Sequence, residues 1–222
     1  MTPAPPGRVL ALFDLDGTIT RHDTLAQYLW GYLRRHPRRL ARLPQVLPAL
    51  GRFVLGYADR GELKSAWIRL ILGGCTRTEL ETWTAHFVPQ LIANGVMPGA
   101  RAAIEAHRNA GDLLVLLSAS PDLNVPAIGH ALGFEQTVCT GVAWSGERLA
   151  GQLTTPNRRG AEKLRCLEAL RAQHPRLPIV AYGNAASDLE HLARAERGVL
   201  VNGSPAARRR AAQLGIACAV WR

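Results

Sequence analysis

The chain has 222 residues and a formal net charge of +10, with 47% hydrophobic and 6% aromatic residues. This composition is typical of one compact globular domain, or of a domain with a modest insertion, and it excludes a large disordered protein. No apolar run is long enough to span a bilayer or to form the core of a signal peptide, so we expect a cytoplasmic protein.

The four cysteines are far apart in the sequence, at Cys75, Cys139, Cys166 and Cys218. Their spacing fits neither a thiolate zinc site nor a dense disulfide framework. We therefore expect reduced thiols that are mostly buried.

Almost all of the positive charge is arginine, because Lys64 and Lys163 are the only lysines. Residues 34–60 contain seven arginines and a single acid, Asp59. Such an excess of positive charge attracts phosphate esters, nucleic acid and acidic lipid headgroups alike, so it does not identify the partner. A solvated arginine-rich face is the simpler interpretation of the same residues.

The first predicted element is a strand at residues 9–13, an apolar run that stops at Asp14 as a buried parallel strand would. Residues 24–93 then have helical spacing throughout, with breaks at Pro37, Pro44 and Gly73–Gly74. We expect this segment to be a helical insertion between the first strand and the rest of the sheet.

Strands and helices alternate in the remainder of the chain. Apolar runs predict strands at 113–117, 179–182 and 199–201, and helical spacing predicts helices at 100–110, 161–172 and 189–195. The alternation predicts an α/β fold, a Rossmann-like parallel sheet with helices on both faces. Residues 137–153 alternate around Ser145–Gly146 and are expected to form a small hairpin flap.

Two carboxylates, Asp14 and Asp16, follow the first strand, where open α/β sheets bind ligands. Side chains at i and i+2 can point toward one crevice, and their mutual repulsion favours a hard cation such as Mg²⁺ between them. One carboxylate could then attack phosphorus while the other moves a proton. A turn that uses Asp and Gly17 for their backbone preferences is the alternative for an isolated pair.

Further polar groups follow the other predicted strands. Ser118 and Ser120 follow the second strand and could hold an anion, although Ser120 also suits a helix cap near residue 122. Lys163 begins the helix before the third strand and could hold a phosphoryl group. Asn184 and Asp188 follow the third strand and could complete a metal site.

The ordered set D-x-D-G-T, S, K, G-N-x-x-x-D resembles the haloacid dehalogenase superfamily of phosphohydrolases along essentially the whole chain. The sequences of residues 13–20 and 117–121 are similar to the corresponding motifs of the branch that contains phosphoserine phosphatase. Residues 71–88 and the basic start of the insertion are also similar to the phosphatidylglycerophosphatase C type. The resemblance implies a Rossmann-like catalytic core at 1–21 and 97–222 and a helical cap at 22–96.

The resemblance also implies roles for individual residues. Asp14 matches the nucleophile that becomes an aspartyl-phosphate, and Asp16 matches the general acid and base. Ser118 matches the hydroxyl that binds a phosphoryl oxygen, Lys163 the stabilising cation, and Asp188 an acid of the metal motif. We therefore expect a Mg²⁺-dependent phosphomonoester hydrolase that acts on a phosphorylated small molecule or a lipid phosphate.

One position departs from the pattern, because Asn184 stands where many relatives have an acid. Its amide oxygen can ligate Mg²⁺ but brings no negative charge. The expected metal residues are thus Asp14, Asp16, Asn184 and Asp188.

Substrate-binding residues are harder to assign. We expect Ser120, Asp23 and Arg159 to contact the substrate, although Asp23 also suits the N-cap of the first cap helix and Arg159 a surface position.

A basic module with weak or no catalysis is the alternative function, one that binds phosphate or contacts an anionic inner-membrane surface through residues 34–60. Nucleic acid is not an expected partner, since the basic segment lacks interleaved exposed aromatics and a recognised motif. Residues 43–57 are apolar but too short to span a bilayer, which suits a peripheral position.

Overall fold

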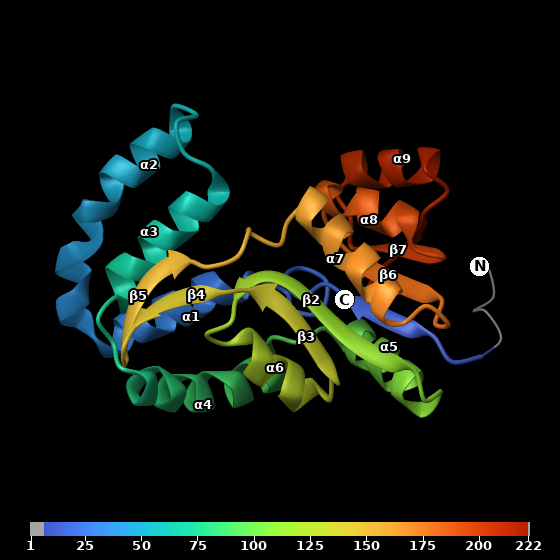
Figure 1. The fold of residues 1–222 in the computed structure, drawn as a ribbon, viewed down its shortest axis with the longest axis horizontal. Coiled ribbons are helices and arrows are strands. Elements are labelled where there is room, and N and C mark those ends of the chain that lie inside the picture. The colour runs from blue at the N-terminus through green and yellow to red at the C-terminus, as the bar shows by residue number, and fades with distance from the viewer. Residues whose placement is uncertain (1–6, 222) are drawn as a thin grey trace.

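The computed structural model describes residues 7–221 and centres on one parallel six-stranded sheet (Figure 1). The strand order is β3-β2-β1-β6-β7-β8. Its members are β1 (Leu10–Phe13), β2 (Leu113–Pro121), β3 (Gln136–Thr140), β6 (Ile179–Gly183), β7 (Arg197–Val201) and β8 (Ala217–Ala219). The predicted α/β, Rossmann-like class is confirmed, and β1 lies in the interior of the sheet between β2 and β6.

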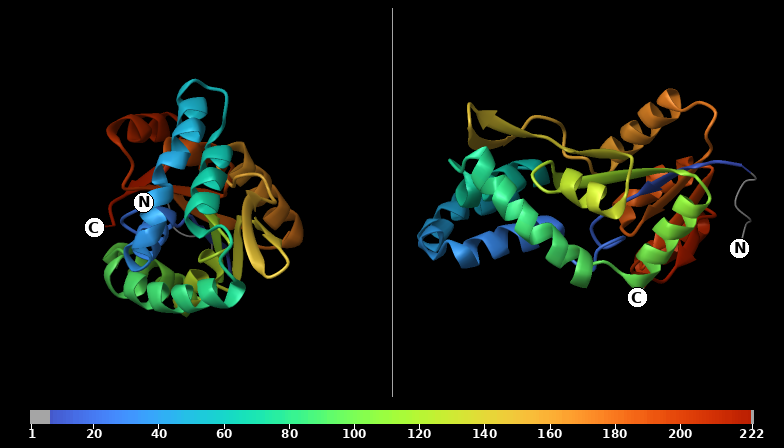
Figure 2. Two further views of the ribbon diagram at one scale, coloured as in Figure 1. Left: turned by 90° about the vertical axis from the view of Figure 1, so that its left-hand side faces the viewer. Right: turned by 90° about the horizontal axis from the view of Figure 1, so that it is seen from below.

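Four α-helices and a 3₁₀ segment lie between β1 and α5 (Pro98–Asn109) and gather at one end of the molecule (Figures 1 and 2). They are α1 (Thr24–Arg35), η1 (Pro37–Val46), α2 (Leu47–Val54), α3 (Arg60–Leu72) and α4 (Arg77–Asn94). We call residues 24–94 the helical cap. Capping boxes begin α3 at Asp59 and α4 at Thr76. The predicted breaks at Pro37 and Gly73 are present, but Pro44 lies inside η1.

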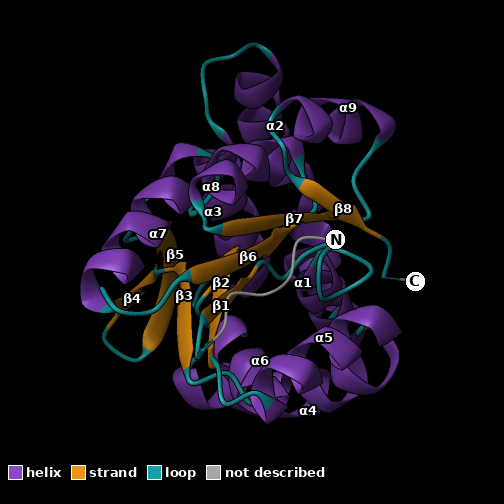
Figure 3. Cartoon of the chain, turned by 90° about the vertical axis from the view of Figure 1, so that its right-hand side faces the viewer, coloured by secondary structure: helices purple, strands orange, loops and turns teal. Residues whose placement is uncertain are grey.

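The remaining helices cover both faces of the sheet (Figure 3). Leu10 and Leu12 pack on the face covered by α7 (Ala161–Gln173), α8 (Leu189–Arg194) and α9 (Pro205–Gln213). Ala11 and Phe13 point to the opposite face, which α5 and α6 (Val125–Leu132) cover. Both faces of β1 are buried, so its continuous apolar run is what a central parallel strand requires.

The structure corrects three predicted boundaries. Residues 137–140 belong to β3 in the main sheet, so the hairpin consists only of β4 (Val142–Ser145) and β5 (Arg148–Leu153). The second strand also continues through Ser118 to Pro121, because Pro121 pairs with Thr140 after a register shift. Consequently α6 begins at Val125, beyond the predicted start near residue 122.

The hairpin is fastened to the helical cap. The Gly74 amide donates to the Leu149 carbonyl, and the Leu149 amide donates to the Cys75 carbonyl, both at 2.9 Å. At the base of the cap, the Arg21 amide donates to Gly95 at 3.0 Å and the Met97 amide to Ile19 at 2.9 Å. Backbone hydrogen bonds therefore hold the cap at two separate places.

All four cysteines are free thiols, as predicted. Cys75 and Cys166 are buried, but Cys139 is half-buried and Cys218 is exposed, so the expectation of mostly buried thiols holds for only two of them. Within residues 7–221, no helix combines the length and the apolar character that crossing a membrane requires.

Candidate active site

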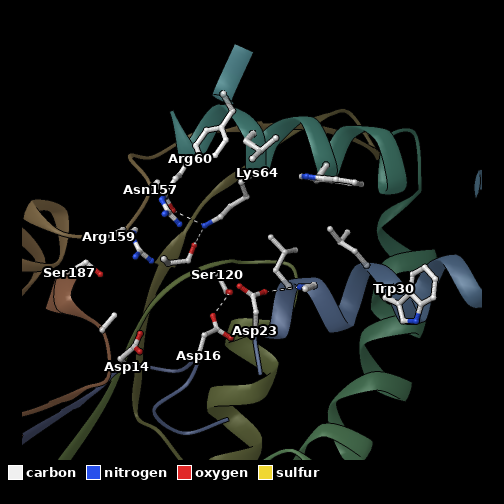
Figure 4. A pocket seen from close by; sticks show the side chains of 18 of the residues that line it. Asp14, Asp16, Asp23, Trp30, Arg60, Lys64, Ser120, Asn157, Arg159 and Ser187 are labelled. Atoms are coloured by element: carbon white, nitrogen blue, oxygen red, sulfur yellow. Dashed lines mark hydrogen bonds between the residues drawn. The ribbon is translucent and has the colours of Figure 1, made fainter. Parts of the chain in front are cut away.

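A cavity of about 610 Å³ opens where the carboxyl end of β1 meets the helical cap (Figure 4). Asp14, Asp16, Lys163, Asn184 and Asp188 all line it, although they come from separate segments of the sequence. Parallel strands end at the same edge of a sheet, so the polar residues that follow β1 and β6 converge there. The cap supplies the rest of the wall.

Lys163 lies between two carboxylates at the base of the cavity. Its Nζ donates to Asp14 Oδ1 at 2.7 Å and to Asp188 Oδ1 at 2.8 Å. The three side chains are nearly inaccessible to solvent, with exposed fractions of 4%, 8% and 2%. The other oxygen of Asp188 accepts from the amides of Asn184 and Ala185 at 3.1 and 2.9 Å. Both oxygens of Asp188 are therefore used in binding the protein itself.

The pKa values of Asp14 and Asp188 are shifted in opposite directions. Burial raises the pKa of Asp14 to about 6, although the Lys163 ammonium lowers it in part. Burial alone would also raise the pKa of Asp188, but Lys163, His191 and backbone amides hold it below its usual range. Burial opposes the charge of Lys163, yet its two carboxylate partners raise its pKa. Asp188 is thus a counter-ion for Lys163, whereas Asp14 has its pKa closer to neutral pH.

Asp16 is held apart from Lys163 by a different set of contacts. Its Oδ2 accepts from Ser120 Oγ and its Oδ1 from the Thr24 amide, both at 2.6 Å. Burial raises the pKa of Asp16, and Asp23 adds to that effect. A carboxyl group with a raised pKa, next to an ionised nucleophile candidate, is suited to giving up a proton.

Gly17 allows Asn184 to approach the loop that carries both aspartates. Gly17 has φ +79°, and a Cβ at this position would lie 2.0 Å from Asn184 Nδ2. Any other residue would be strained in this conformation and would displace the amide. Asn184 consequently lines the cavity beside Asp14 and Asp16.

The other predicted site residues differ in whether they reach the cavity. Ser118 is fully buried and is not among the described residues that line the cavity, and its Oγ accepts from the Ser120 amide at 3.0 Å. Ser120 itself binds Asp16, and Asp23 caps α1 by accepting from the Ala26 amide at 2.8 Å. Ser120, Asp23 and the exposed Arg159 nevertheless line the cavity, so their predicted contact with substrate stays a prediction.

Lys64 is a cavity residue to which the sequence assigned no role. Its Nζ donates to the Ala119 carbonyl at 2.5 Å and to Asn157 Oδ1 at 2.7 Å, which links α3 to the core. Burial lowers the pKa of Lys64 to about 8. The sequence feature that could have pointed to Lys64 is that it is one of only two lysines in an arginine-rich chain.

The donor atoms suit a hard cation with few protein ligands. Within residues 7–221, no three His, Cys, Asp or Glu side chains converge as a metal-ligand group. Asp14 and the Asn184 amide do offer oxygen ligands at the cavity wall. Mg²⁺ commonly takes one or two protein ligands and completes its shell with water and substrate phosphate. The residues present therefore fit Mg²⁺. Within the protein, Asp14 accepts hydrogen bonds from Lys163 and Thr18, and Asp188 accepts them from Lys163 and two backbone amides.

A family model described as haloacid dehalogenase-like hydrolase matches residues 11–193. The chain belongs to the haloacid dehalogenase-like hydrolases. Protein CicA of Caulobacter vibrioides is 33% identical over 202 residues, which cover 89% of each chain.

Solved structures share the fold of this hydrolase. A protein of unknown function from Bordetella pertussis Tohama I superimposes with a TM-score of 0.80 at 23% identity, covering 96% of this chain and 98% of that one. A substrate-bound phosphoserine phosphatase superimposes with a TM-score of 0.67 at 16% identity, covering 98% and 95%. The predicted superfamily is confirmed, whereas the similarity to the phosphatidylglycerophosphatase C type stays a prediction.

Proposed function

We propose that this hydrolase is a Mg²⁺-dependent phosphomonoesterase that acts through an aspartyl-phosphate on Asp14. The observation that carries the proposal is the arrangement of Asp14, Lys163 and Asp16, in which one carboxylate faces a buried ammonium and the other is held separately. This arrangement supports two different roles for two carboxylates. The helical cap and its flanking residues, 22–96 together, would cover the site.

The proposed reaction consists of two phosphoryl transfers. An Asp14 oxygen attacks phosphorus, the ester P–O bond breaks, and Asp16 gives its proton to the departing alkoxide. Asp16, now ionised, then takes a proton from water as that water attacks phosphorus, and the P–O bond to Asp14 breaks. Lys163 offsets negative charge in both steps. The expected contact of Ser118 with a phosphoryl oxygen would require its buried hydroxyl to become accessible from the cavity.

Asp14 and Asn184 would hold the Mg²⁺, with Asp16 nearby. When bound, the ion would neutralise charge on the phosphoryl oxygens. Asp188 supports this set indirectly, by keeping Lys163 charged and oriented.

Asn184→Asp is expected to tighten Mg²⁺ binding about ten-fold, since it adds a negative charge to the ligand set at nearly constant shape. Without metal, the added carboxylate repels Asp14, so the variant should unfold at a lower temperature in chelator and at a higher one in excess Mg²⁺. The measurements are the Mg²⁺ concentration for half-maximal hydrolysis and melting curves in both conditions. An unchanged Mg²⁺ requirement would remove Asn184 from the proposed metal site.

Asp16→Asn is expected to slow hydrolysis of alkyl phosphates by about 10²- to 10⁴-fold, because an alkoxide needs a proton to leave. With p-nitrophenyl phosphate, whose leaving group needs none, the first turnover should survive and release one equivalent of nitrophenol before the reaction stalls. Rapid-mixing kinetics measure this burst. Equal slowing of the first turnover for both esters would contradict the acid role of Asp16.

The substrate proposal rests on the cavity wall, which becomes apolar beyond the carboxylates. Leu25, Leu29 and Leu33 of α1 lie along it with Phe53 and Trp67 from α2 and α3. We infer a phosphate ester with an apolar body, either a small molecule or a lipid phosphate. A panel with Mg²⁺ tests this inference, comparing phosphoserine, alkyl phosphates of increasing length, and phosphatidylglycerophosphate in detergent. Rates that do not increase with apolar length would contradict it.

Membrane contact is a second candidate function, favoured by the exposed apolar side chains of the cap. Val54, Leu55 and Tyr57 are 74%, 70% and 74% exposed, and Leu47 is 62% exposed. Exposed arginines lie in the same segment, at positions 34, 38, 42 and 52. Apolar and basic side chains on one short segment suit the interface of an anionic bilayer.

Co-sedimentation with anionic vesicles is expected at low salt and should weaken when Arg34, Arg38 and Arg42 are replaced together by Gln. Each basic group near such a surface contributes about 1 kcal/mol. Arg39 is left in place because it donates to the Ile71 carbonyl at 2.7 Å and helps hold the cap together. Binding that does not depend on salt, or that the triple variant retains, would leave these arginines as a solvated face.

A further inference from the structure

A second hollow, of about 560 Å³, lies in the helical cap between η1, α2 and α3. Helices α2 and α3 lie side by side at this end of the molecule (Figure 1). Leu63 is the only described residue that lines both this hollow and the catalytic cavity. We call the second space the outer hollow. None of the residues assigned to catalysis, to the metal or to the substrate lines it, so the reaction at Asp14 does not account for it.

Helix α3 separates the outer hollow from the catalytic cavity. Lys64 and Trp67 line the catalytic cavity, whereas Ala66 and Arg69 line the outer hollow. The members of each pair are three positions apart and so share a face of the helix. The second pair is shifted by two positions from the first, which is a rotation of about 200°. The outer hollow is therefore on the opposite face of α3 and is not an extension of the catalytic cavity.

The outer hollow has mostly apolar walls. Val46 is 6% exposed, and Leu63, Ala66 and Leu70 are half-buried. Sites for small molecules are typically concave spaces of about 300–1,000 Å³ that are lined mainly by apolar side chains and a few polar groups. The outer hollow has this size and this kind of lining, so it fits a small molecule with an apolar body.

The charged groups of the outer hollow are three arginines and one acid. Arg42, Arg52 and Arg69 come from η1, α2 and α3 in turn, and Glu62 is the only acid among the described lining residues. Three positive charges and one negative charge give the lining a net charge of +2. Arg52 Nη2 lies 3.9 Å from Glu62 Oε1, and both side chains are more than half exposed. Within residues 7–221, no ion pair or hydrogen bond joins the Arg42 or Arg69 side chain to another residue.

This arrangement favours an anion over a neutral molecule. The exposed pair of Arg52 and Glu62 contributes little to stability, so a bound anion can replace Glu62 as the partner of Arg52 at small cost. A guanidinium group binds carboxylate, sulfonate and phosphate oxygens with two parallel N–H donors. Arg42 and Arg69 are exposed and are available for such a contact.

We propose that the outer hollow is a second ligand site, which binds a small amphipathic anion. The acidic head would contact the three arginines, and the apolar body would pack against Val46, Leu63 and Leu70. A carboxylate, a sulfonate or a phosphate head has the required chemistry. The inference goes beyond the proposed phosphatase and does not depend on it, because no residue of the outer hollow takes part in that reaction.

Titration calorimetry with hexanesulfonate tests this site. A sulfonate combines an anionic head with an apolar body and has no phosphate ester for Asp14 to attack. Hexanol has the body without the charge, and inorganic sulfate has the charge without the body. We expect hexanol and sulfate each to bind at least about ten-fold more weakly than hexanesulfonate, and the affinity of hexanesulfonate to decrease at high salt. Equal affinity for hexanesulfonate and for either partial ligand would overturn the proposal.

Three single variants test whether the ligand binds in the outer hollow. Arg42→Gln and Arg69→Gln each remove one charge from an exposed side chain and should weaken hexanesulfonate binding by about three- to ten-fold. Ala66→Phe fills the space and should abolish binding. Arg208→Gln is the matched control, because it removes one charge from the exposed face of α9 and should leave the affinity unchanged.

The two arginine variants keep the test decisive if Ala66→Phe does not fold, since thermal melts should show that exposed arginines are dispensable for the fold. An affinity that both arginine variants retain would place the ligand elsewhere, such as in the catalytic cavity, and would overturn the proposal. The experiment measures binding and not turnover. Its result therefore stands whether or not the protein hydrolyses phosphate esters.

Discussion

Asp14→Asn is expected to lower turnover by at least about 10³-fold without unfolding the protein. A neutral amide cannot attack phosphorus, so the covalent step is lost. The fold should tolerate the change, because Asn has nearly the shape of Asp and because the raised pKa of Asp14 means that its ionised form is less favoured in the folded protein than in the unfolded chain. Lys163 keeps Asp188 as a partner. We expect the free energy of unfolding to change by no more than about 1 kcal/mol.

Steady-state hydrolysis and thermal melts in the same buffer measure these two effects. Asp59→Asn is a suitable control, since Asp59 is an exposed helix cap and Asn caps helices equally well. A folded Asp14→Asn protein that still turns over would end the aspartyl-phosphate proposal.

Lys163→Met is expected to abolish activity and also to destabilise the fold by about 3–5 kcal/mol. The substitution leaves Asp14 and Asp188 buried without their common counter-ion, and an unpaired buried charge is strongly destabilising. Chemical unfolding in the presence of chelator measures the loss. Adding Asp188→Asn to the variant should recover part of the stability, because it removes one of the unpaired charges.

The pH dependence of this variant gives a second test. In the native protein the pKa of Asp188 lies below its usual range, so its contribution to stability is present above the unfolded pKa and is lost on acidification. Without Lys163, burial dominates and raises both carboxyl pKa values above their unfolded values. The Lys163→Met protein should therefore become more stable as the pH falls from 7 to 5. A melting temperature of the Lys163→Met protein that falls between pH 7 and pH 5 would contradict this account.

The centre of the fold could be predicted because its strands are buried on both faces. β1, β6 and β7 are apolar runs bounded by polar residues, and the parallel pattern brings the residues after β1, β2 and β6 to one edge of the sheet. The convergence of Asp14, Lys163 and Asp188 is a consequence of that topology. Their pairing is not, since only the folded structure shows Lys163 closing on both carboxylates.

Other features could not be predicted from local pattern. β8 has only three residues and is little buried, and α9 is rich in Arg and Ala. Neither element therefore has apolar residues that recur at the spacing of a strand or a helix. β3 alternates like a hairpin strand but pairs with β2. Lys64 lies on a cap helix far from the motifs in sequence, and tertiary packing alone brings it to the cavity.

The hydrogen bonds that hold the helical cap bear on how substrate reaches the cavity. Backbone hydrogen bonds hold the cap at residues 19–21 with 95–97, and again where β5 meets residues 74–75. Opening of the cap as a rigid lid would have to stretch or break the second set, next to β5. The side chain of Trp30 lines the cavity and is 57% exposed, so the cavity also reaches the surface at its apolar end. We therefore expect a substrate with a long apolar body to extend past Trp30 while its phosphate stays at Asp14.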